Sequence, residues 1–461
     1  MTPTANASPV LDAVRAAATT VIGPEDPEYD LARRVMYDDD AHPLAIARPA
    51  DAAEVARVVD VARETGSELA VRSGGHSGAG HGTSDGGIVL DLAALKGLDL
   101  DVAGRTLWAG TGLTAGEVGT ALAEHGLVVG FGDTASVGIG GITSGGGIGY
   151  LVRKLGLTID NVLAAEIVTA DGAVRIVDDE HEPDLFWAVR GGAGNVGVVT
   201  RFQYRLSELP ALVGGMLILP ATPEAVAGFL AAAAAAPDEL STIANVMPCP
   251  PMPFVPAERH GELVIFGMLA YAGTPDAAEP VLAPFRALAE PISDMIRPIS
   301  YMELFPPEDP DYHPIAAART MFLDRVDRDV AAKIVATLTE HARTSNAQMV
   351  VTQLRVLGGA MARVPAEATA FAHRSSRIMA SLAALVPTRE DLPAHQAWVD
   401  GYAAALQQSD RGRYVNFLMD EGPEAVAAAF PGETGRRLAD IKRRYDPANL
   451  FRRNQNVAPA S

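Results

Sequence analysis

The alternation of apolar and polar positions differs between the first 206 residues and the rest of the chain. In the first part, short apolar runs predict short strands, and tight turns at Ala103 and Gly104 and at Asp171 and Gly172 predict two hairpins. The strands are expected at 68–72, 88–91 and 196–206, and on both sides of the second turn within 162–178. This part is therefore expected to be mixed α+β.

Two helices interrupt these strands. Asp51 followed three positions later by Glu54 predicts a capping box at the start of a helix that Gly66 closes. Apolar residues recur at intervals of three and four between those ends, which is the period of a half-buried helix. A second helix is expected over 114–125.

From residue 209 onward the elements become longer and glycine becomes rarer. Amphipathic helices are expected at 223–236, 275–290 and 328–344, and apolar strands at 262–273 and 347–357. This alternation predicts a second domain, an antiparallel sheet backed by helices. A further helix is expected near the C-terminus at 433–444.

The charge balance excludes one class of partner. The 461 residues include 57 acidic and 37 basic side chains, a formal net charge of -20. Sequence-independent binding to nucleic acid needs clustered Lys and Arg to displace counterions from phosphates, so we expect none. Any bound phosphate must be held locally, by backbone amides more than by a basic surface.

The cysteine count and the apolar runs exclude further classes of protein. A single cysteine, Cys249, excludes an intramolecular disulfide and a zinc ribbon. No apolar run approaches the roughly 18 to 20 residues of a membrane span. The first twenty residues lack the basic start and apolar core of a secretory signal, so a cytoplasmic protein with no membrane partner is expected.

Glycine is concentrated in three clusters within the first 200 residues. Nine of the twenty residues from Gly130 to Gly149 are glycine, and further clusters lie at 73–82 and 190–197. Such density lets the backbone approach a ligand closely and costs conformational entropy that a merely structural loop would not need. The clusters are therefore candidate binding loops.

The third cluster contains the spacing of a dinucleotide fingerprint, at Gly192, Gly194 and Gly197. That fingerprint requires a helix after it, so that a pyrophosphate meets the helix N-terminus. The residues that follow are β-branched and alternating, and they predict a strand instead. A nicotinamide-dependent reductase is thus an alternative that the predicted strand disfavours.

The first cluster follows a predicted strand directly. A Gly-Gly turn followed by His76 and Ser77 presents successive backbone N–H groups to an anion, a nest suited to a pyrophosphate. The spacing of His76, His81 and Asp85 matches no common metal-ligand pattern, so no metal is expected. An isolated loop histidine is more often solvated or hydrogen-bonded than part of a reactive site.

Five ordered motifs together resemble the berberine-bridge-enzyme-like branch of the vanillyl-alcohol-oxidase superfamily, including its carbohydrate and antibiotic-tailoring oxidases. The motifs are VRSGGHS at 71–77, GIGGITSGGGIGYLVRKLGLTIDN at 138–161, VTADG at 168–172, DLFWAVRGGAGNVGVVT at 184–200, and YVNF with YDPANLFRRNQN near the C-terminus. The resemblance implies an α+β fold with a two-subdomain FAD-binding domain of the PCMH type. It places that domain at 1–207, a substrate domain at 208–410, and a segment at 411–461 that returns to the FAD domain.

In the family, the histidine of the SGGHS loop is joined covalently to the 8α carbon of FAD, and His76 occupies that position. Many relatives add a second bond through a cysteine in a motif similar to TASVGIGG at 134–141. Thr134 stands where that cysteine would be, and Cys249 lies far away in the sequence. The resemblance therefore implies one covalent flavin bond.

The resemblance implies further contacts to FAD along the three clusters and at the C-terminus. These positions are Arg72, Ser73, Gly74, Gly75, Ser77, Val137, Gly138, Gly140, Gly141, Ser144, Gly145, Gly146, Gly147, Asp160, Asn161, Gly197, Val198, Val199 and Asn454. A residue at the position of Val137 controls access of dioxygen to the flavin in relatives. A small valine there is typical of oxidases and favours dioxygen as electron acceptor.

Candidate catalytic residues lie in two places. Several relatives use the tyrosine of a Y-x-N motif as a base, here Tyr414, with Asn416 near the flavin ring. An unperturbed tyrosine titrates near 10, so its pKa must be lowered or its proton relayed. A half-buried structural aromatic is the other interpretation. Gln353 and Arg355 alternate on one strand, which carries no acidic residue, and are candidate groups of the substrate pocket.

The expected function is that of an FAD oxidase that passes hydride from a small organic substrate to the flavin and releases hydrogen peroxide. A dehydrogenase or oxidative cyclase with another acceptor is the alternative within the fold, and a non-catalytic flavin carrier is a further one. The sequence does not rank alcohol, amine, sugar or polyketide substrates. A monomer or homodimer is expected.

Overall fold

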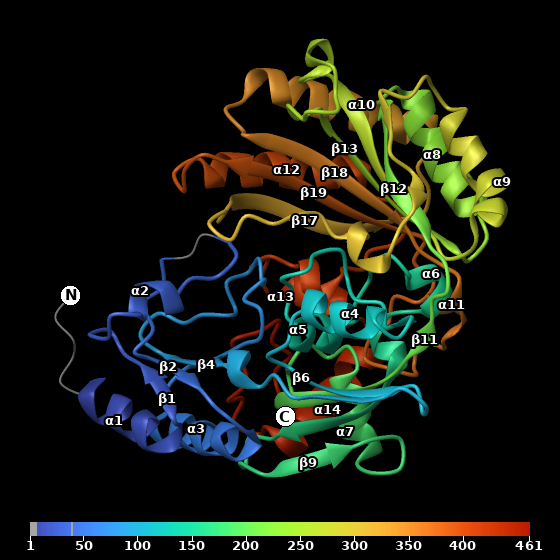
Figure 1. Cartoon of the computed structure of the whole chain (residues 1–461). Coiled ribbons are helices and arrows are strands. Elements are labelled where there is room, and N and C mark those ends of the chain that lie inside the picture. Colours follow the sequence, from blue (N-terminus) through green and yellow to red (C-terminus); the bar gives the residue numbers. More distant parts are fainter. Residues whose placement is uncertain (1–6, 38–39) are drawn as a thin grey trace.

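The computed structural model describes residues 7–37 and 40–461 and has a mixed α+β fold built on three main sheets. Two smaller sheets form the lower part of Figure 1, and an eight-stranded sheet with its helices forms the upper part. The α+β class that the apolar pattern predicts is confirmed. Within the described ranges, no helix is long and apolar enough to cross a membrane.

The first sheet has four strands in the order β1-β2-β4-β3. Its strands are β1 (Thr20–Ile22), β2 (Ala45–Arg48), β4 (Ile88–Asp91) and β3 (Leu69–Arg72). Both β2 and β3 run parallel to β4, so β3 needs a crossover, which helix α3 (Ala52–Thr65) supplies. Helices α1 (Ala7–Ala17) and α3 pack on each other beside this sheet, and α2 (Tyr29–Ala32) follows β1.

The start of α3 differs from the predicted capping box. The Asp51 carboxylate accepts the Glu54 N–H at 2.8 Å, as expected. Glu54 does not return the bond, because its carboxylate accepts the Thr19 hydroxyl and N–H and the Ala50 N–H instead. A tertiary contact with Thr19, together with a local one from the Ala50 N–H just before the helix, thus replaces the capping-box bond. Gly66 ends the helix with φ +67°, as predicted.

The second sheet has five antiparallel strands in the order β5-β6-β10-β8-β9. They are β5 (Leu98–Asp101), β6 (Thr106–Gly110), β10 (Val198–Arg205), β8 (Val162–Val168) and β9 (Val174–Val177). Both predicted hairpins are present, and β10 follows the third glycine cluster directly. The strand prediction there is confirmed, and the Rossmann interpretation is wrong because no helix follows the fingerprint glycines.

Short elements connect and cover this sheet. They are α4 (Ala115–Ala123), β7 (Leu127–Val128), α5 (Ile139–Ser144), α6 (Val152–Leu155), α7 (Pro183–Val189) and β11 (Ser207–Glu208), with β7 paired to β11. The core between sheet and helices is apolar and includes Phe131 and Phe202, whose rings both contact the ring of Tyr204. The second glycine cluster, with α5 inside it, lies at the edge of this core.

The third sheet has eight antiparallel strands, in the order β15-β12-β14-β13-β18-β19-β17, with β16 also paired to β12. The strands are β12 (Val213–Pro220), β13 (Leu240–Pro248), β14 (Leu263–Tyr271), β15 (Ser293–Asp294), β16 (Arg297–Pro298), β17 (Ile315–Leu323), β18 (Met349–Val356) and β19 (Ile378–Val386). Its helices are α8 (Pro223–Ala235), α9 (Pro275–Arg286), α10 (Arg328–Thr344), α11 (Ala360–Arg363) and α12 (Leu392–Leu406). The predicted sheet backed by helices is present.

Alternation along β18 decides which side chains reach the other half of the molecule. Val350 and Leu354 belong to the core between the sheet and its helices. Val351, Gln353 and Arg355, at the intervening positions, line a cavity on the opposite face. The alternation seen in the sequence therefore becomes a division between core and cavity.

The C-terminal segment carries α13 (Pro423–Ala429) and α14 (Glu433–Tyr445). Val415, Leu418, Leu438 and Ile441 join the core of the five-stranded sheet, and Figure 1 shows α13 and α14 in the lower part of the molecule. The chain thus crosses to the upper sheet and comes back, which brings Tyr414 and Asn416 to the glycine clusters.

Candidate active site

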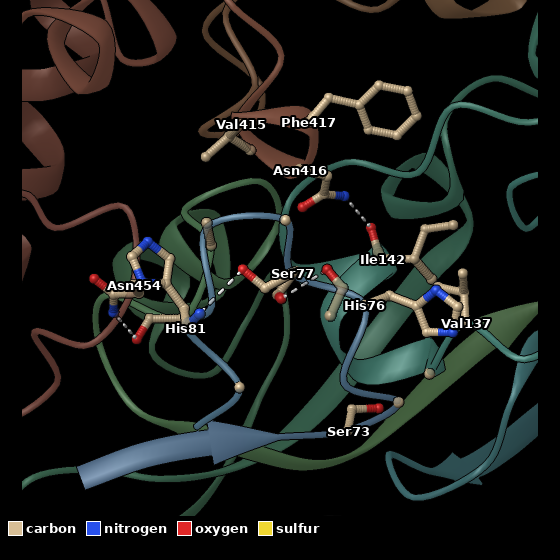
Figure 2. Close-up of a pocket in the computed structure, with 18 of the residues that line it drawn as sticks. Ser73, His76, Ser77, His81, Val137, Ile142, Val415, Asn416, Phe417 and Asn454 are labelled. Carbon is tan, nitrogen blue, oxygen red and sulfur yellow. Dashed lines mark hydrogen bonds between the residues drawn. The ribbon is translucent and has the colours of Figure 1, made fainter. Parts of the chain in front are cut away.

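A cavity of about 490 Å³ lies where the two small sheets, the large sheet and the C-terminal segment meet. Most of the predicted cofactor positions line it: Arg72, Ser73, Gly74, Gly75, His76, Ser77, Val137, Gly138, Gly140, Gly141, Ser144, Gly197, Val198, Val199 and Asn454. All four predicted catalytic positions, Gln353, Arg355, Tyr414 and Asn416, line it as well. Segments far apart in the sequence thus converge on one space (Figure 2).

The first and second glycine clusters touch each other through their backbones. A Cβ atom on Gly74 would lie 2.3 Å from the Gly138 nitrogen, so only glycine permits this approach. Ser73 fastens the contact, because its hydroxyl donates to the Thr111 carbonyl at 2.5 Å and accepts the Gly140 N–H at 3.3 Å. The result is a cradle of backbone on one side of the cavity.

Arg72 lies at the cavity, but its guanidinium is committed to the protein. It donates to Asp91 at 2.9 Å and to the Ala32 carbonyl at 2.7 Å. The side chain is buried, and the ion pair anchors the end of β3, from which the SGGHS loop departs. Its part in the site is to fix that loop.

His76 lies on the cavity wall with one ring nitrogen occupied. Its Nε2 is 2.9 Å from the Ser136 hydroxyl, and among the described residues no hydrogen bond reaches Nδ1. Burial lowers the pKa of His76, and the Glu308 carboxylate opposes that shift. The ring is therefore neutral near pH 7, with a free nitrogen available to act as a nucleophile.

His81 and Asn454 carry polar atoms without partners among the described residues. Both ring nitrogens of His81 and the Asn454 Oδ1 are inaccessible and make no hydrogen bond. Burial and the nearby Arg453 guanidinium lower the pKa of His81 to about 4, so its ring is neutral too. Figure 2 shows His76 and His81 on either side of Ser77. Unpartnered polar atoms beside a cavity indicate a ligand that supplies the missing hydrogen bonds.

Five predicted cofactor positions do not line the cavity: Gly145, Gly146, Gly147, Asp160 and Asn161. Asp160 instead pairs with the buried Arg374 at 2.7 and 2.8 Å. Asn161 donates to the carbonyls of Leu155 and Leu157. The three glycines give room to neighbouring side chains: a Cβ on Gly145 would overlap Asn416. These residues support the cavity wall from behind.

On the side of the large sheet, a chain of polar groups crosses the cavity. The Gln353 amide nitrogen donates to Asn245 at 2.9 Å, and its oxygen accepts from Arg355 at 2.7 and 3.0 Å. Arg355 also donates to the Asp133 carboxylate, and its guanidinium lies 5.3 Å from the centre of the Phe417 ring. Arg355 is buried, and it joins the large sheet to the second glycine cluster.

Asp133 is a cavity residue that the sequence did not reveal. The substrate-pocket strand has no carboxylate of its own, and Asp133 supplies one from the second glycine cluster, 222 positions before its partner Arg355. No local pattern signals a pair at that separation. Tyr37, Phe417 and Met419 also line the cavity and were missed.

The Tyr414 hydroxyl lies at a point where three N–H groups converge. Its oxygen accepts from the Gly147 N–H at 3.0 Å, the Ile148 N–H at 3.2 Å and the Asn416 amide at 3.1 Å. Burial raises the pKa of Tyr414, and the three donors and Arg355 oppose the rise because they stabilise a phenolate. The same contacts fix the ring rigidly, so both a catalytic and an anchoring role fit this geometry.

The residues present fit a flavin dinucleotide. The cavity offers a backbone cradle for a pyrophosphate, a neutral histidine and unpartnered polar atoms along its length. The large sheet faces the cavity with small side chains, which leave space in it for a second molecule. These side chains are Ala318, Val351 and Ser381. An elongated cofactor with a substrate above it suits this shape.

Comparison with known proteins gives the family. Residues 43–178 match the model of an FAD binding domain, and residues 413–458 match the model described as berberine and berberine like. The chain is 32% identical to (R)-6-hydroxynicotine oxidase of Paenarthrobacter nicotinovorans, over 95% of this chain and 96% of that protein. The chain belongs to the berberine-bridge-enzyme-like family of FAD-linked oxidoreductases.

Solved structures of the family share the fold. The crystal structure of 6-hydroxy-D-nicotine oxidase from Arthrobacter nicotinovorans matches with a TM-score of 0.82 and 28% identity, covering 96% of this chain and 98% of that one. Physcomitrella patens BBE-like 1 matches with a TM-score of 0.86 at 23% identity, covering 98% and 99%. This berberine-bridge-like protein is thus an FAD-dependent oxidoreductase with a PCMH-type fold, as the motifs implied.

Proposed function

We propose that this chain is an oxidase that carries FAD on His76, removes hydride from a small organic substrate, and passes the electrons to dioxygen. The observation that supports this most is the single cavity that joins His76 and the glycine cradle to Gln353, Arg355 and Tyr414. Cofactor and substrate positions share one space, which direct hydride transfer requires. Bound FAD would supply the hydride acceptor and the site of reaction with dioxygen.

The cofactor would be held mainly by backbone. The loop from Ser73 to Ser77 and the segment from Gly138 to Gly141 would form the cradle for the pyrophosphate, with 197–199 on the adenine side and Asn454 as a further contact. Backbone N–H groups bind phosphate oxygens without a net positive charge, which is consistent with a chain of net charge -20.

The covalent bond is proposed at one atom only. In glucooligosaccharide oxidase of Acremonium strictum, which shares this fold at 21% identity, the flavin is a 6-S-cysteinyl, 8α-N1-histidyl FAD. Here Thr134 lines the cavity at the cysteine position, and Cys249 is buried elsewhere in the large-sheet unit. The proposed enzyme therefore keeps the histidyl bond and lacks the cysteinyl one.

On the substrate side, hydride transfer requires removal of a proton from an adjacent hydroxyl or amine. Tyr414 is the proposed base. Burial raises its pKa, and the three N–H donors to its oxygen oppose that rise because they stabilise the phenolate form, so its proton would have to be relayed. Gln353 and Arg355 would orient the substrate, since both are held by further hydrogen bonds. Asp133 is bound to Arg355, so its charge is balanced in the site.

Dioxygen is the proposed acceptor because Val137, at the position that controls oxygen access in relatives, lines the cavity. A dehydrogenase or oxidative cyclase with another acceptor is the second candidate. The proposed partners are a small-molecule substrate and dioxygen.

Acid precipitation tests the covalent link. Flavin colour should remain with the precipitated wild type and be lost to the supernatant in His76→Ala. His341→Gln is the matched control, because His341 packs on Trp398 outside the cavity and should leave the colour protein-bound. Flavin that washes off the wild type would refute the link.

Stopped-flow mixing of the reduced enzyme with air separates the two candidate functions. An oxidase should reoxidise its flavin within the time of one turnover and release one hydrogen peroxide per substrate oxidised. Reoxidation far slower than turnover with an artificial acceptor would favour the dehydrogenase.

A further inference from the structure

We propose that the large sheet holds a subsite for a hydroxyl group of an uncharged substrate, formed by Gln353 and Ser381 with Thr320 behind them. The proposal rests on the proposed function and deepens it. It adds two residues to the site, Ser381 and Thr320, and it names neutral alcohols, in place of amine cations or carboxylates, as the class of substrate.

The subsite belongs to a row of four polar side chains that crosses the large sheet. The backbone register places Asn245 of β13 opposite Gln353 of β18. Ser381 of β19 in turn lies opposite both Gln353 and Thr320 of β17. Side chains directly opposite each other on adjacent strands share a face of the sheet, with Cβ atoms about 5 Å apart. Gln353 and Ser381 line the cavity, so the row is on the face toward the flavin side.

Three groups of this row have hydrogen-bonding capacity left over. The Gln353 amide donates one proton to Asn245 Oδ1 at 2.9 Å, and its second proton has no partner in the described part of the chain. The Ser381 hydroxyl lines the cavity and bonds to no described residue. Thr320 is 1% exposed, and its Oγ1 is buried without a partner among residues 7–37 and 40–461. A ligand that bonds to Ser381, and lets Ser381 bond to Thr320, would satisfy both hydroxyl groups.

Hydroxyl and amide groups suit a neutral ligand better than an ion. A serine hydroxyl donates one hydrogen bond and accepts others, so Ser381 can bond to a substrate hydroxyl in front and to Thr320 behind. A charged substrate group would need an opposite charge to offset the loss of its hydration. The row itself supplies none.

The two charged side chains beside the row are committed to each other. Arg355 donates two hydrogen bonds to the Gln353 amide oxygen, one to the Ile148 carbonyl and one to the Asp133 carboxylate. A substrate carboxylate would have to compete with Asp133 for Arg355, and an ammonium group would have to compete with Arg355 for Asp133. Both ions are therefore disfavoured, and Arg355 acts on the substrate by fixing the Gln353 amide.

A row of small apolar side chains runs beside the polar one. Val351 and Ala318 line the cavity, and each lies opposite Ala383 in the register. A hydrocarbon skeleton can contact these side chains while its hydroxyl group reaches Ser381. The two rows together suit a substrate with an apolar body and a hydroxyl group.

Three probes with the same ring test the preference for a neutral group. At pH 7, benzyl alcohol is neutral, benzylamine is a cation and benzoate is an anion. The full-length enzyme is reduced and kept free of oxygen, so that no probe can be oxidised, and calorimetry measures each dissociation constant. Benzyl alcohol should bind at least about 10-fold more tightly than either ion. Equal or tighter binding of an ion, or no binding of benzyl alcohol, would overturn the proposal.

Ser381→Ala tests the subsite directly. Benzyl alcohol should bind about 10-fold more weakly, and the two ions should change less than about 3-fold, because only the alcohol loses a hydrogen bond. Thr352→Val is the matched control: Thr352 lies on the other face of β18, bonded to Tyr402 at 2.7 Å, and its loss should leave all three dissociation constants unchanged. Wild-type affinity for benzyl alcohol in Ser381→Ala would overturn the subsite.

Thr320→Val separates a positioning role from a structural one. Because the variant lacks an unpartnered buried hydroxyl, the ligand-free protein should melt at a higher temperature while benzyl alcohol binds about 3-fold more weakly. Thr320→Ser keeps the hydroxyl and should keep the affinity. A lower melting temperature or an unchanged affinity in Thr320→Val would overturn the role of Thr320.

Failure of the proposed function is distinguishable from failure of the subsite, because these measurements record binding and not turnover. An enzyme that shows the expected preference, but whose flavin no substrate reduces, would refute the oxidase and leave the subsite standing. An enzyme that oxidises amines or acids in preference to alcohols would refute the subsite and leave the oxidase standing.

Discussion

The two halves of the molecule line the same cavity in different ways. On the flavin side, backbone segments meet at van der Waals distance, as at Gly74 and Gly138. On the substrate side, a regular strand presents alternate side chains, as at Gln353 and Arg355. The close backbone approach in the cradle depends on its glycines, whereas a strand accepts new side chains without a change in its backbone conformation. The first half therefore suits a constant cofactor and the second a variable substrate.

Gly74→Ala should have the largest effect. The new methyl group would lie 2.3 Å from the Gly138 nitrogen, and backbone cannot yield as a flexible side chain can. We expect a loss of on the order of 4 kcal/mol in the free energy of unfolding, above the usual cost of overpacking. Denaturant unfolding measures it.

Gly141→Ala is the matched control within the same cradle. No atom lies within 4 Å of its added Cβ, and it occupies helix α5, where alanine is preferred. Because Gly141 lines the cavity, this variant should fold normally and bind FAD more weakly. Equal stability of both variants would contradict the inference that the close approach of Gly74 to Gly138 requires glycine.

Asp133→Asn tests the ion pair with Arg355, which joins the two halves of the molecule across the cavity. The substitution leaves the buried Arg355 guanidinium without a carboxylate, which typically costs about 3 kcal/mol. Glu224→Gln, which breaks an exposed pair with Arg328, should leave the free energy of unfolding nearly unchanged in the same experiment. Similar values for the two variants would show that the pair across the cavity is unimportant for stability.

Tyr414→Phe tests whether Tyr414 acts as the catalytic base or only anchors the backbone. If Tyr414 accepts the substrate proton, flavin reduction by substrate should slow by about 10²-fold in single-turnover measurements. If the hydroxyl only anchors the Gly147 and Ile148 amides, reduction should be nearly unchanged while the melting temperature falls. The melting temperature should fall in either case because both hydrogen bonds are lost, so the rate of reduction separates the two roles.

His81→Gln should have the smallest effect, and one that depends on pH. The folded-state pKa of His81, about 4, lies below its ordinary value of 6.5, so the unfolded chain binds a proton first as the pH falls. This group thus lowers the stability of the flavin-free wild type by about 2 kcal/mol between pH 7 and pH 5. The variant should lose that part of the pH dependence, and identical pH profiles would mean that His81 is not buried neutral.

Much of the architecture could be predicted because its signals are local. The hairpin turn at Asp171 and Gly172, the helix end at Gly66 and the strand after Gly197 depend on neighbouring residues only, and each is present. The prediction of a capping box at Asp51 was wrong for the opposite reason, because the Glu54 carboxylate binds partners outside its own helix.

Three features of the site could be predicted from local sequence patterns: the glycine clusters, the histidine in the first of them, and the alternation that sends Gln353 and Arg355 to one face. The contacts of Asp133 with Arg355, of Ser136 with His76, and of Asp160 with Arg374 behind the cavity wall arise from the packing of distant segments. Periodicity and turn chemistry act over a few residues, and a sequence displays them directly. Contacts between distant segments depend on how whole sheets pack, and no local pattern encodes that.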